Sequence, residues 1–170
     1  MKKTKALTLS AVLSALSIAL MLLGAVIEVF DLCTVMLASF CTLFALIRID
    51  GKHAWLVFAV TSVLALLLLP SKAVALEYLL FGGYYPILRA ATAKLRPLPA
   101  YGIKLAVFNA ALTVLLLLFR ELFVAADTPL LLEVSTYLLG NGAFLLYDYA
   151  LGRVGFMMVH RLRPRFGRQK

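Results

Sequence analysis

The chain has 170 residues, of which 64% are hydrophobic, and it carries a formal net charge of +9. Its mean hydropathy of +0.99 is too high for the surface of a water-soluble domain, so lipid is the expected solvent. The basic residues lie in short clusters between apolar runs, which is a signal of membrane topology. This distribution argues against nucleic acid as a partner.

Six apolar runs follow one another along the chain, and each is about long enough to cross a bilayer as a helix. They cover residues 6–27, 32–47, 54–69, 73–88, 101–119 and 130–152. Because the runs are continuous and do not alternate as strands of a membrane barrel do, the predicted fold class is all-α. We expect a polytopic membrane protein, with residues 1–170 forming a single six-transmembrane-helix domain that ends in a basic tail at 153–170.

The basic residues also predict the orientation of the chain in the membrane. If the N-terminus lies inside, 15 of the 17 Lys and Arg residues fall on the inner side, and only Lys72 and Arg120 fall outside. Membrane proteins keep an excess of Lys and Arg in their cytoplasmic segments. We therefore expect both termini in the cytoplasm of a multi-pass protein of the cell membrane, most simply the bacterial cytoplasmic membrane.

The first span carries small residues at helical spacing. Ala11, Ala15 and Ala19 recur every four residues and share one face, with serines on the adjoining arc. Those serines are Ser10, Ser14 and Ser17. Such a flat face lets another helix approach closely, either from this protein or from a separate membrane subunit. The leucines of the opposite side are expected to face lipid; they are Leu13, Leu16, Leu20 and Leu23.

The last span carries a polar stripe on one helical face. Its members are Glu133, Tyr137, Asn141 and Asp148. Because charge is costly inside a membrane, such a stripe faces the bundle or a wet cavity. Glu133, Tyr137 and Asn141 are therefore predicted to line a substrate pocket that opens outward. Asp148, near the inner end, is expected to form a structural pair with a basic residue such as Arg89.

The fourth and fifth spans add further pocket candidates. Phe81 and Tyr84 follow Glu77 at i+4 and i+7, so a carboxylate and two rings could orient a planar ligand. The alternative is a Glu77 that is hydrogen-bonded to a neighbouring helix, with two aromatic residues in the core. Pro86 follows two glycines and predicts a kink. Asn109 is a weaker candidate, because a single membrane Asn more often bonds another helix.

Motifs of catalysis and nucleotide binding are missing from the sequence. No G-x-S-x-G, G-x-x-x-x-G-K-[ST] or G-x-G-x-x-G run occurs, and no Cys or His cluster has metal-ligand spacing. We expect no catalytic residue, no cofactor and no metal. An enzyme that acts on lipid is a weaker third hypothesis, since intramembrane carboxylates can do acid and base work, although no paired arrangement demands it.

The opening stretch at residues 3–16, KTKALTLSAVLSAL, resembles the start of the substrate-binding S components of energy-coupling factor transporters. The chain length and the six-helix plan are similar to that family too. In that family an alanine motif spaced by four on the first helix docks on the transmembrane T component. The resemblance implies that Ala11, Ala15 and Ala19 form this docking face.

The same resemblance implies a function. Such a subunit captures a micronutrient such as a vitamin from outside and passes it inward by toppling in the membrane. ATP hydrolysis is supplied by separate ATPase subunits. No signature of a particular vitamin is present, so the ligand stays open. The competing hypothesis is a non-transporting membrane scaffold or assembly partner, in which the polar stripe only ties helices together.

Overall fold

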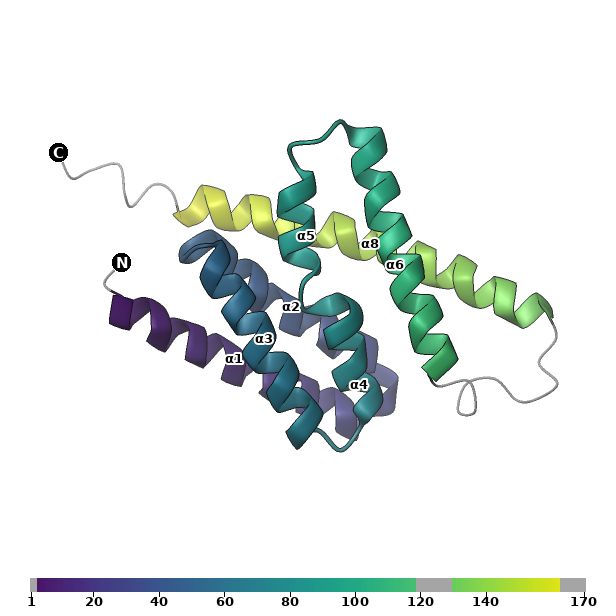
Figure 1. The fold of residues 1–170 in the computed structure, drawn as a ribbon, viewed down its shortest axis with the longest axis horizontal. Coiled ribbons are helices and arrows are strands. Elements are labelled where there is room, and N and C mark those ends of the chain that lie inside the picture. Colours follow the sequence, from purple (N-terminus) through teal and green to yellow (C-terminus); the bar gives the residue numbers. More distant parts are fainter. Residues whose placement is uncertain (1–2, 119–129, 163–170) are drawn as a thin grey trace. The chain divides into compact units, whose positions relative to one another are not determined.

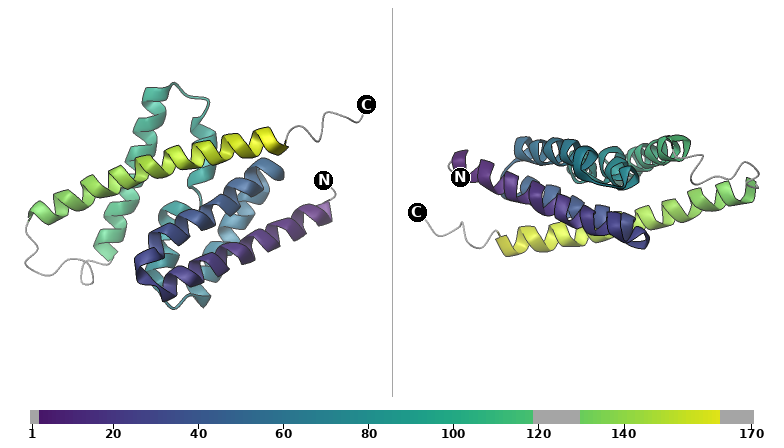
Figure 2. Two further views of the ribbon diagram at one scale, coloured as in Figure 1. Left: turned by 180° about the vertical axis from the view of Figure 1, so that it is seen from behind. Right: turned by 90° about the horizontal axis from the view of Figure 1, so that it is seen from below.

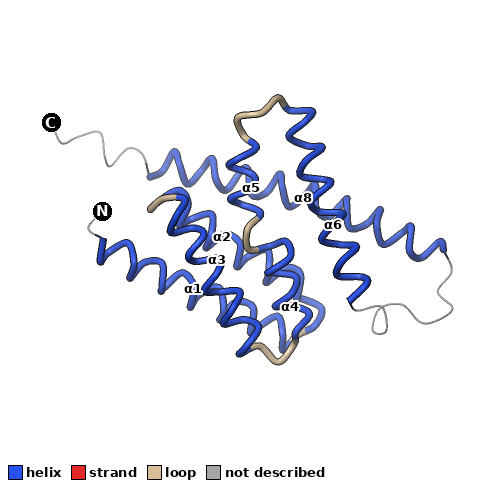
Figure 3. Tube along the Cα trace, viewed as in Figure 1, coloured by secondary structure: helices blue, strands red, loops and turns tan. Residues whose placement is uncertain are grey.

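The computed structural model describes residues 3–118 and 130–162, without the side chains of residues 28, 130–133 and 162. These residues form helices and short connections, and no strand occurs among them (Figure 3). The predicted all-α class is therefore confirmed. Four helices are long and apolar enough to cross a membrane (Figure 1); they are α1 (Lys3–Val26), α2 (Asp31–Arg48), α3 (Gly51–Leu68) and α6 (Pro97–Leu118).

The predicted fourth span is interrupted, as its glycines and proline indicate. It consists of α4 (Lys72–Glu77), the π-helical turn η2 (Tyr78–Gly82) and α5 (Tyr85–Thr92). The N–H of Gly83 donates to the carbonyl of Tyr78 at 2.7 Å, which is the wide hydrogen bond of a π-turn. A Cβ at Gly82 would overlap the side chain of Val35 in α2, so glycine also permits close packing there. The predicted kink is confirmed.

The predicted sixth span lies within a longer helix. α8 (Leu130–Leu162) continues past residue 152 into the segment that we predicted to be a basic tail. The short helix η1 (Glu28–Phe30) links α1 to α2, where the sequence indicates an outer loop. The four long helices match four of the predicted spans, whereas a total of six and the placement of both termini in the cytoplasm stay predictions.

The chain divides into two compact units. Unit 1 comprises Met1–Ile87 with Tyr149–Lys170, and unit 2 comprises Leu88–Asp148. In unit 1, α1 packs against α2 and α3, and α4 contacts all three (Figure 2). Buried residues of these helices form two clusters, one around Met21, Val35 and Tyr78 and the other around Leu13, Cys41 and Val57.

The interior of unit 1 is rich in small hydroxyl residues. Ser10 donates to the carbonyl of Ala6 at 3.0 Å, Ser17 to that of Leu13 at 2.9 Å, and Ser39 to that of Met36 at 2.6 Å. Each of these buried hydroxyls therefore finds an acceptor within its own helix. Short side chains whose hydroxyl groups are hydrogen-bonded in this way allow helices to approach closely without leaving those hydroxyls unpaired.

The turn between α2 and α3 is held by a side-chain cap. A carboxylate oxygen of Asp50 accepts from the backbone N–H of His53 at 2.8 Å and lies 2.7 Å from Nδ1 of the same residue. These contacts hold the pKa of the Asp50 carboxyl below its usual value. The cap satisfies a backbone N–H donor at the start of α3. The basic residues Arg48 and Lys52 flank this turn in the sequence.

Helices α1 and α2 are in close contact at Gly24, where a Cβ would overlap the side-chain oxygen of Thr34. We expect Gly24→Ala to destabilise the protein by about 1 to 3 kcal/mol, since the helices must separate or Thr34 must change rotamer. The measurement is thermal unfolding of the purified protein in detergent. Gly102→Ala is the matched control, because a Cβ there meets nothing within 4 Å. Equal midpoints for the two variants would contradict the close contact.

Candidate functional site

A buried ion cluster lies in unit 2. Asp148 of α8 is 2% exposed, and its Oδ1 accepts from Nε of Arg89 in α5 at 2.7 Å. Nζ of Lys104 in α6 lies 3.2 Å from both carboxylate oxygens. The predicted pair of Asp148 with Arg89 is confirmed. Lys104 was missed, because no local spacing links it to the other two residues and it adjoins a basic segment that is predicted to lie in the cytoplasm.

This cluster joins the consecutive helices α5 and α6 to α8, which is more distant in the sequence. In α6, all of which the structure describes, Ala100 and Lys104 are the buried residues, so a charged side chain forms part of the packing of this helix. Hydrogen bonds between ionised groups are stronger than neutral ones where water is excluded. In this cluster two cations, Arg89 and Lys104, contact the one carboxylate of Asp148.

The polar stripe of α8 pairs with polar residues of α6. Asn109 and Asn141 exchange two hydrogen bonds of 3.0 Å through their side-chain amides. The hydroxyls of Thr113 and Tyr137 lie 2.9 Å apart. These three predicted pocket residues, Asn109, Tyr137 and Asn141, are therefore used between helices, and a role in ligand binding stays a prediction for them. The rings of Phe108 and Phe144 are stacked between the same two helices, with their centroids 4.8 Å apart.

The other predicted pocket residues with described side chains lie in unit 1. Glu77 ends α4, and its buried Oε2 has no hydrogen-bond partner among the residues that the structure describes. Buried polar atoms without partners are rare in proteins, so this oxygen marks a candidate ligand contact.

The two aromatic candidates that follow Glu77 have different neighbours. The π-turn changes the angle between successive residues, so the face that the α-helical spacing predicts for Phe81 and Tyr84 is not maintained. The Phe81 ring lies 4.8 Å from that of Tyr85, and the Tyr84 ring meets Phe58 edge-on at 5.9 Å. The side chain of Glu133 lies outside the described residues.

The alanine face of α1 is open. Ala11, Ala15 and Ala19 are exposed, whereas the adjoining serines are buried; these are Ser10, Ser14 and Ser17. The helix therefore packs against its own bundle through the serine arc. The expectation that Leu13 faces lipid is wrong, because α2 and α3 bury it to 7% exposure, while Leu16 and Leu23 are exposed as expected.

Comparison with protein families, curated proteins and solved structures finds no match to this chain. Three features of the described residues bear on function. They are the exposed alanine face of α1, the carboxylate oxygen of Glu77 that has no hydrogen-bond partner among these residues, and the ion cluster around Asp148.

Asp148→Asn tests the importance of the ion cluster for folding. The change leaves two cations in a buried site without the carboxylate that balances them, and we expect a loss of about 3 to 5 kcal/mol. Lys104→Met should have a smaller effect, because Arg89 and Asp148 remain as a balanced pair. Thermal unfolding in detergent measures both. An equal loss in the two variants would contradict the central place of Asp148.

The paired amides of α6 and α8 generate a second prediction. Asn141→Leu should lower stability by about 1 to 3 kcal/mol, since the Asn109 amide loses its interhelical partner in an apolar setting. The double variant Asn109→Leu with Asn141→Leu should recover much of that loss, because both partners are then apolar. A double-mutant cycle of unfolding midpoints measures the coupling. Additive losses would show that the two amides act independently.

Proposed function

We propose that the protein is the substrate-capture subunit of a micronutrient uptake transporter, of the S-component type, and that it docks on a membrane T component through α1. The observation that carries the proposal is the exposure of Ala11, Ala15 and Ala19 beside a buried serine arc. A row of small side chains that the protein's own bundle leaves open is suited to close approach by a helix of another subunit.

The ligand is proposed to contact Glu77. Its Oε2 is buried and, within the described residues, has no hydrogen-bond partner, so a donor on a ligand could satisfy it. Half-buried rings of Phe81 and Tyr84 belong to the same segment and offer apolar surface. This supports a small, planar molecule with a positively charged or hydrogen-bond-donating group. Glu133, at the predicted outer end of the last span, stays a second candidate.

Energy for transport is proposed to come from partner subunits. The chain has no phosphate-binding loop motif, so separate ATPases would drive movement through the docked T component. The resemblance of residues 3–16 to S components supports this division of labour. Inward passage would follow from toppling of the subunit in the membrane.

The alternative proposal is a non-transporting membrane scaffold. It is favoured by the hydrogen bonds of Asn109 with Asn141 and of Thr113 with Tyr137, which use the polar stripe to join helices. In this case the alanine face would bind a structural partner, and Glu77 would have no ligand.

The two proposals are separated by purification of the protein from its native membrane in mild detergent. Mass spectrometry then identifies retained small molecules and co-purifying proteins. A bound micronutrient together with a T component and an ATPase supports transport. An empty protein with partners of another kind supports the scaffold.

Substitutions on α1 test the docking face directly. We expect Ala15→Leu to reduce co-purification of the membrane partner at least tenfold, because a leucine holds the two helices apart. Ala59→Leu, the same change on an exposed face of α3, is the matched control and should leave co-purification unchanged. Unfolding midpoints and ligand retention should stay at the wild-type level in both variants.

Glu77→Gln should have the reverse effect, with ligand retention reduced and partner co-purification preserved. Loss of both properties in either variant would contradict the assignment of separate docking and ligand-binding faces.

A further inference from the structure

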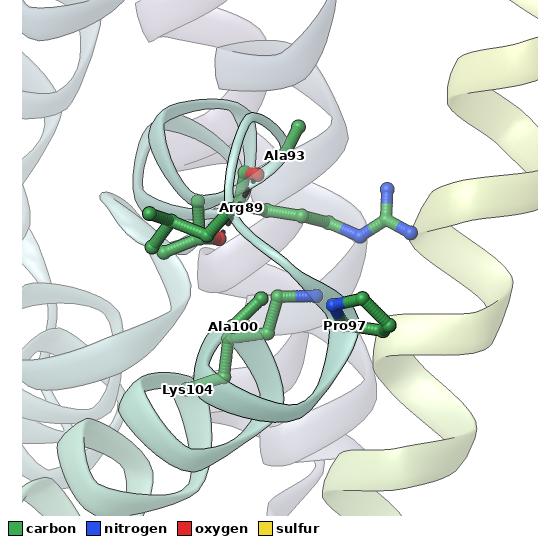
Figure 4. A pocket seen from close by; sticks show the side chains of 7 residues that line it. Arg89, Ala93, Pro97, Ala100 and Lys104 are labelled. Atoms are coloured by element: carbon green, nitrogen blue, oxygen red, sulfur yellow. Dashed lines mark hydrogen bonds between the residues drawn. The ribbon is translucent and has the colours of Figure 1, made fainter.

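A small cavity of about 260 Å³ lies beside the ion cluster in unit 2. It is lined by residues from the end of α5, the connection that follows and the first turns of α6. Figure 4 shows Arg89 reaching out from α5 and Lys104 from α6, with their nitrogen-bearing ends directed to the same side. The cavity therefore combines two basic side chains with the small residues Ala93 and Ala100.

Two basic groups of this cavity share one carboxylate. The side chain of Lys104 is 9% exposed and that of Arg89 is 33% exposed, and both contact the single carboxylate of Asp148. Arg89 uses Nε for that contact, and its Nη atoms make no hydrogen bond within the part of the chain that the structure describes. Up to four N–H donors of a guanidinium thus remain for another acceptor.

Other features of the cavity also suit an anion. The hydroxyl of Thr92 donates to the carbonyl oxygens of Leu88 at 3.0 Å and Arg89 at 3.1 Å. These partly negative oxygens at the end of α5 are therefore already hydrogen-bonded. Pro97 starts the 22-residue helix α6, whose N-terminal end carries partial positive charge. Lys94 and Arg96 are exposed in the connection between the helices and add to the positive potential.

We propose that this cavity binds a phosphate group, carried either by an anionic phospholipid headgroup or by a free phosphate compound. The guanidinium fork of arginine matches phosphate oxygens, and lysine adds a point charge. The volume is below the range of pockets for drug-sized ligands, which fits a single small group. The sequence predicts this connection to lie on the cytoplasmic side, where basic pockets between membrane helices bind anionic headgroups.

The test uses the purified full chain in detergent and three probes. Native mass spectrometry measures retention of phosphatidylglycerol and of phosphatidylcholine, and equilibrium dialysis measures binding of labelled inorganic phosphate. Preferential retention of phosphatidylglycerol identifies a lipid headgroup, and saturable phosphate binding identifies a free phosphate compound. Absence of both in the wild-type protein would overturn the proposal.

Variants assign the binding to this cavity. Arg89→Gln should reduce whichever binding the wild type shows by about tenfold, because one or two charge-assisted hydrogen bonds are lost. Lys52→Gln is the matched control: it removes an exposed charge on the same predicted side of the membrane and should leave binding unchanged. Equal binding by Arg89→Gln and the wild type would overturn the proposal.

Arg89→Lys provides a second variant that preserves the charge beside Asp148 if Arg89→Gln fails to fold. It removes the fork but keeps a cation, so we expect a loss of severalfold and an unchanged unfolding midpoint. Binding at the wild-type level by this variant would count against recognition of phosphate by the guanidinium. Neither outcome depends on whether α1 docks on a transport partner.

Discussion

The hydrocarbon core of a bilayer offers no hydrogen-bond partner, so every polar group at that depth must find one in the chain or in a ligand. Much of this structure follows from that constraint. The serines of α1 donate to carbonyls of their own helix, the amides of Asn109 and Asn141 satisfy each other, and Asp148 sits between two cations. Each arrangement also fixes how closely two helical segments approach.

Several places among the described residues meet the constraint incompletely, and they include the buried hydroxyls of Thr61 and Ser62. In unit 1 the buried Oε2 of Glu77 has no hydrogen-bond partner among the described residues, and in unit 2 two cations share the Asp148 carboxylate beside a cavity. Such sites are unfavourable unless a ligand completes them. The side chains of the two sites carry charges of opposite sign. Glu77 suits a cationic or donor group, and Arg89 with Lys104 suits an anion.

The two faces of α1 illustrate how side-chain chemistry divides a membrane helix between internal and external contacts. Serines and alanines are both small enough for close packing. The serines carry a hydroxyl that is best kept inside the bundle, and Ser17 also reaches the carbonyl of Ala38 at 3.4 Å. Alanines have no polar atom in the side chain, so Ala11, Ala15 and Ala19 can remain open to lipid or to another subunit.

Continuous apolar runs predicted the helical class, because only helices satisfy the backbone in lipid, and four of the six predicted spans correspond to long apolar helices. The pairing of Asp148 with Arg89 could also be predicted, since a membrane carboxylate needs a cation at similar depth. The third member of the cluster, Lys104, could not be predicted from the sequence, because it joins the cluster only when α6 lies against α5 and α8. The same applies to the burial of serines rather than alanines on α1. Periodicity shows that residues share a face, but only the neighbouring helices decide which face they cover.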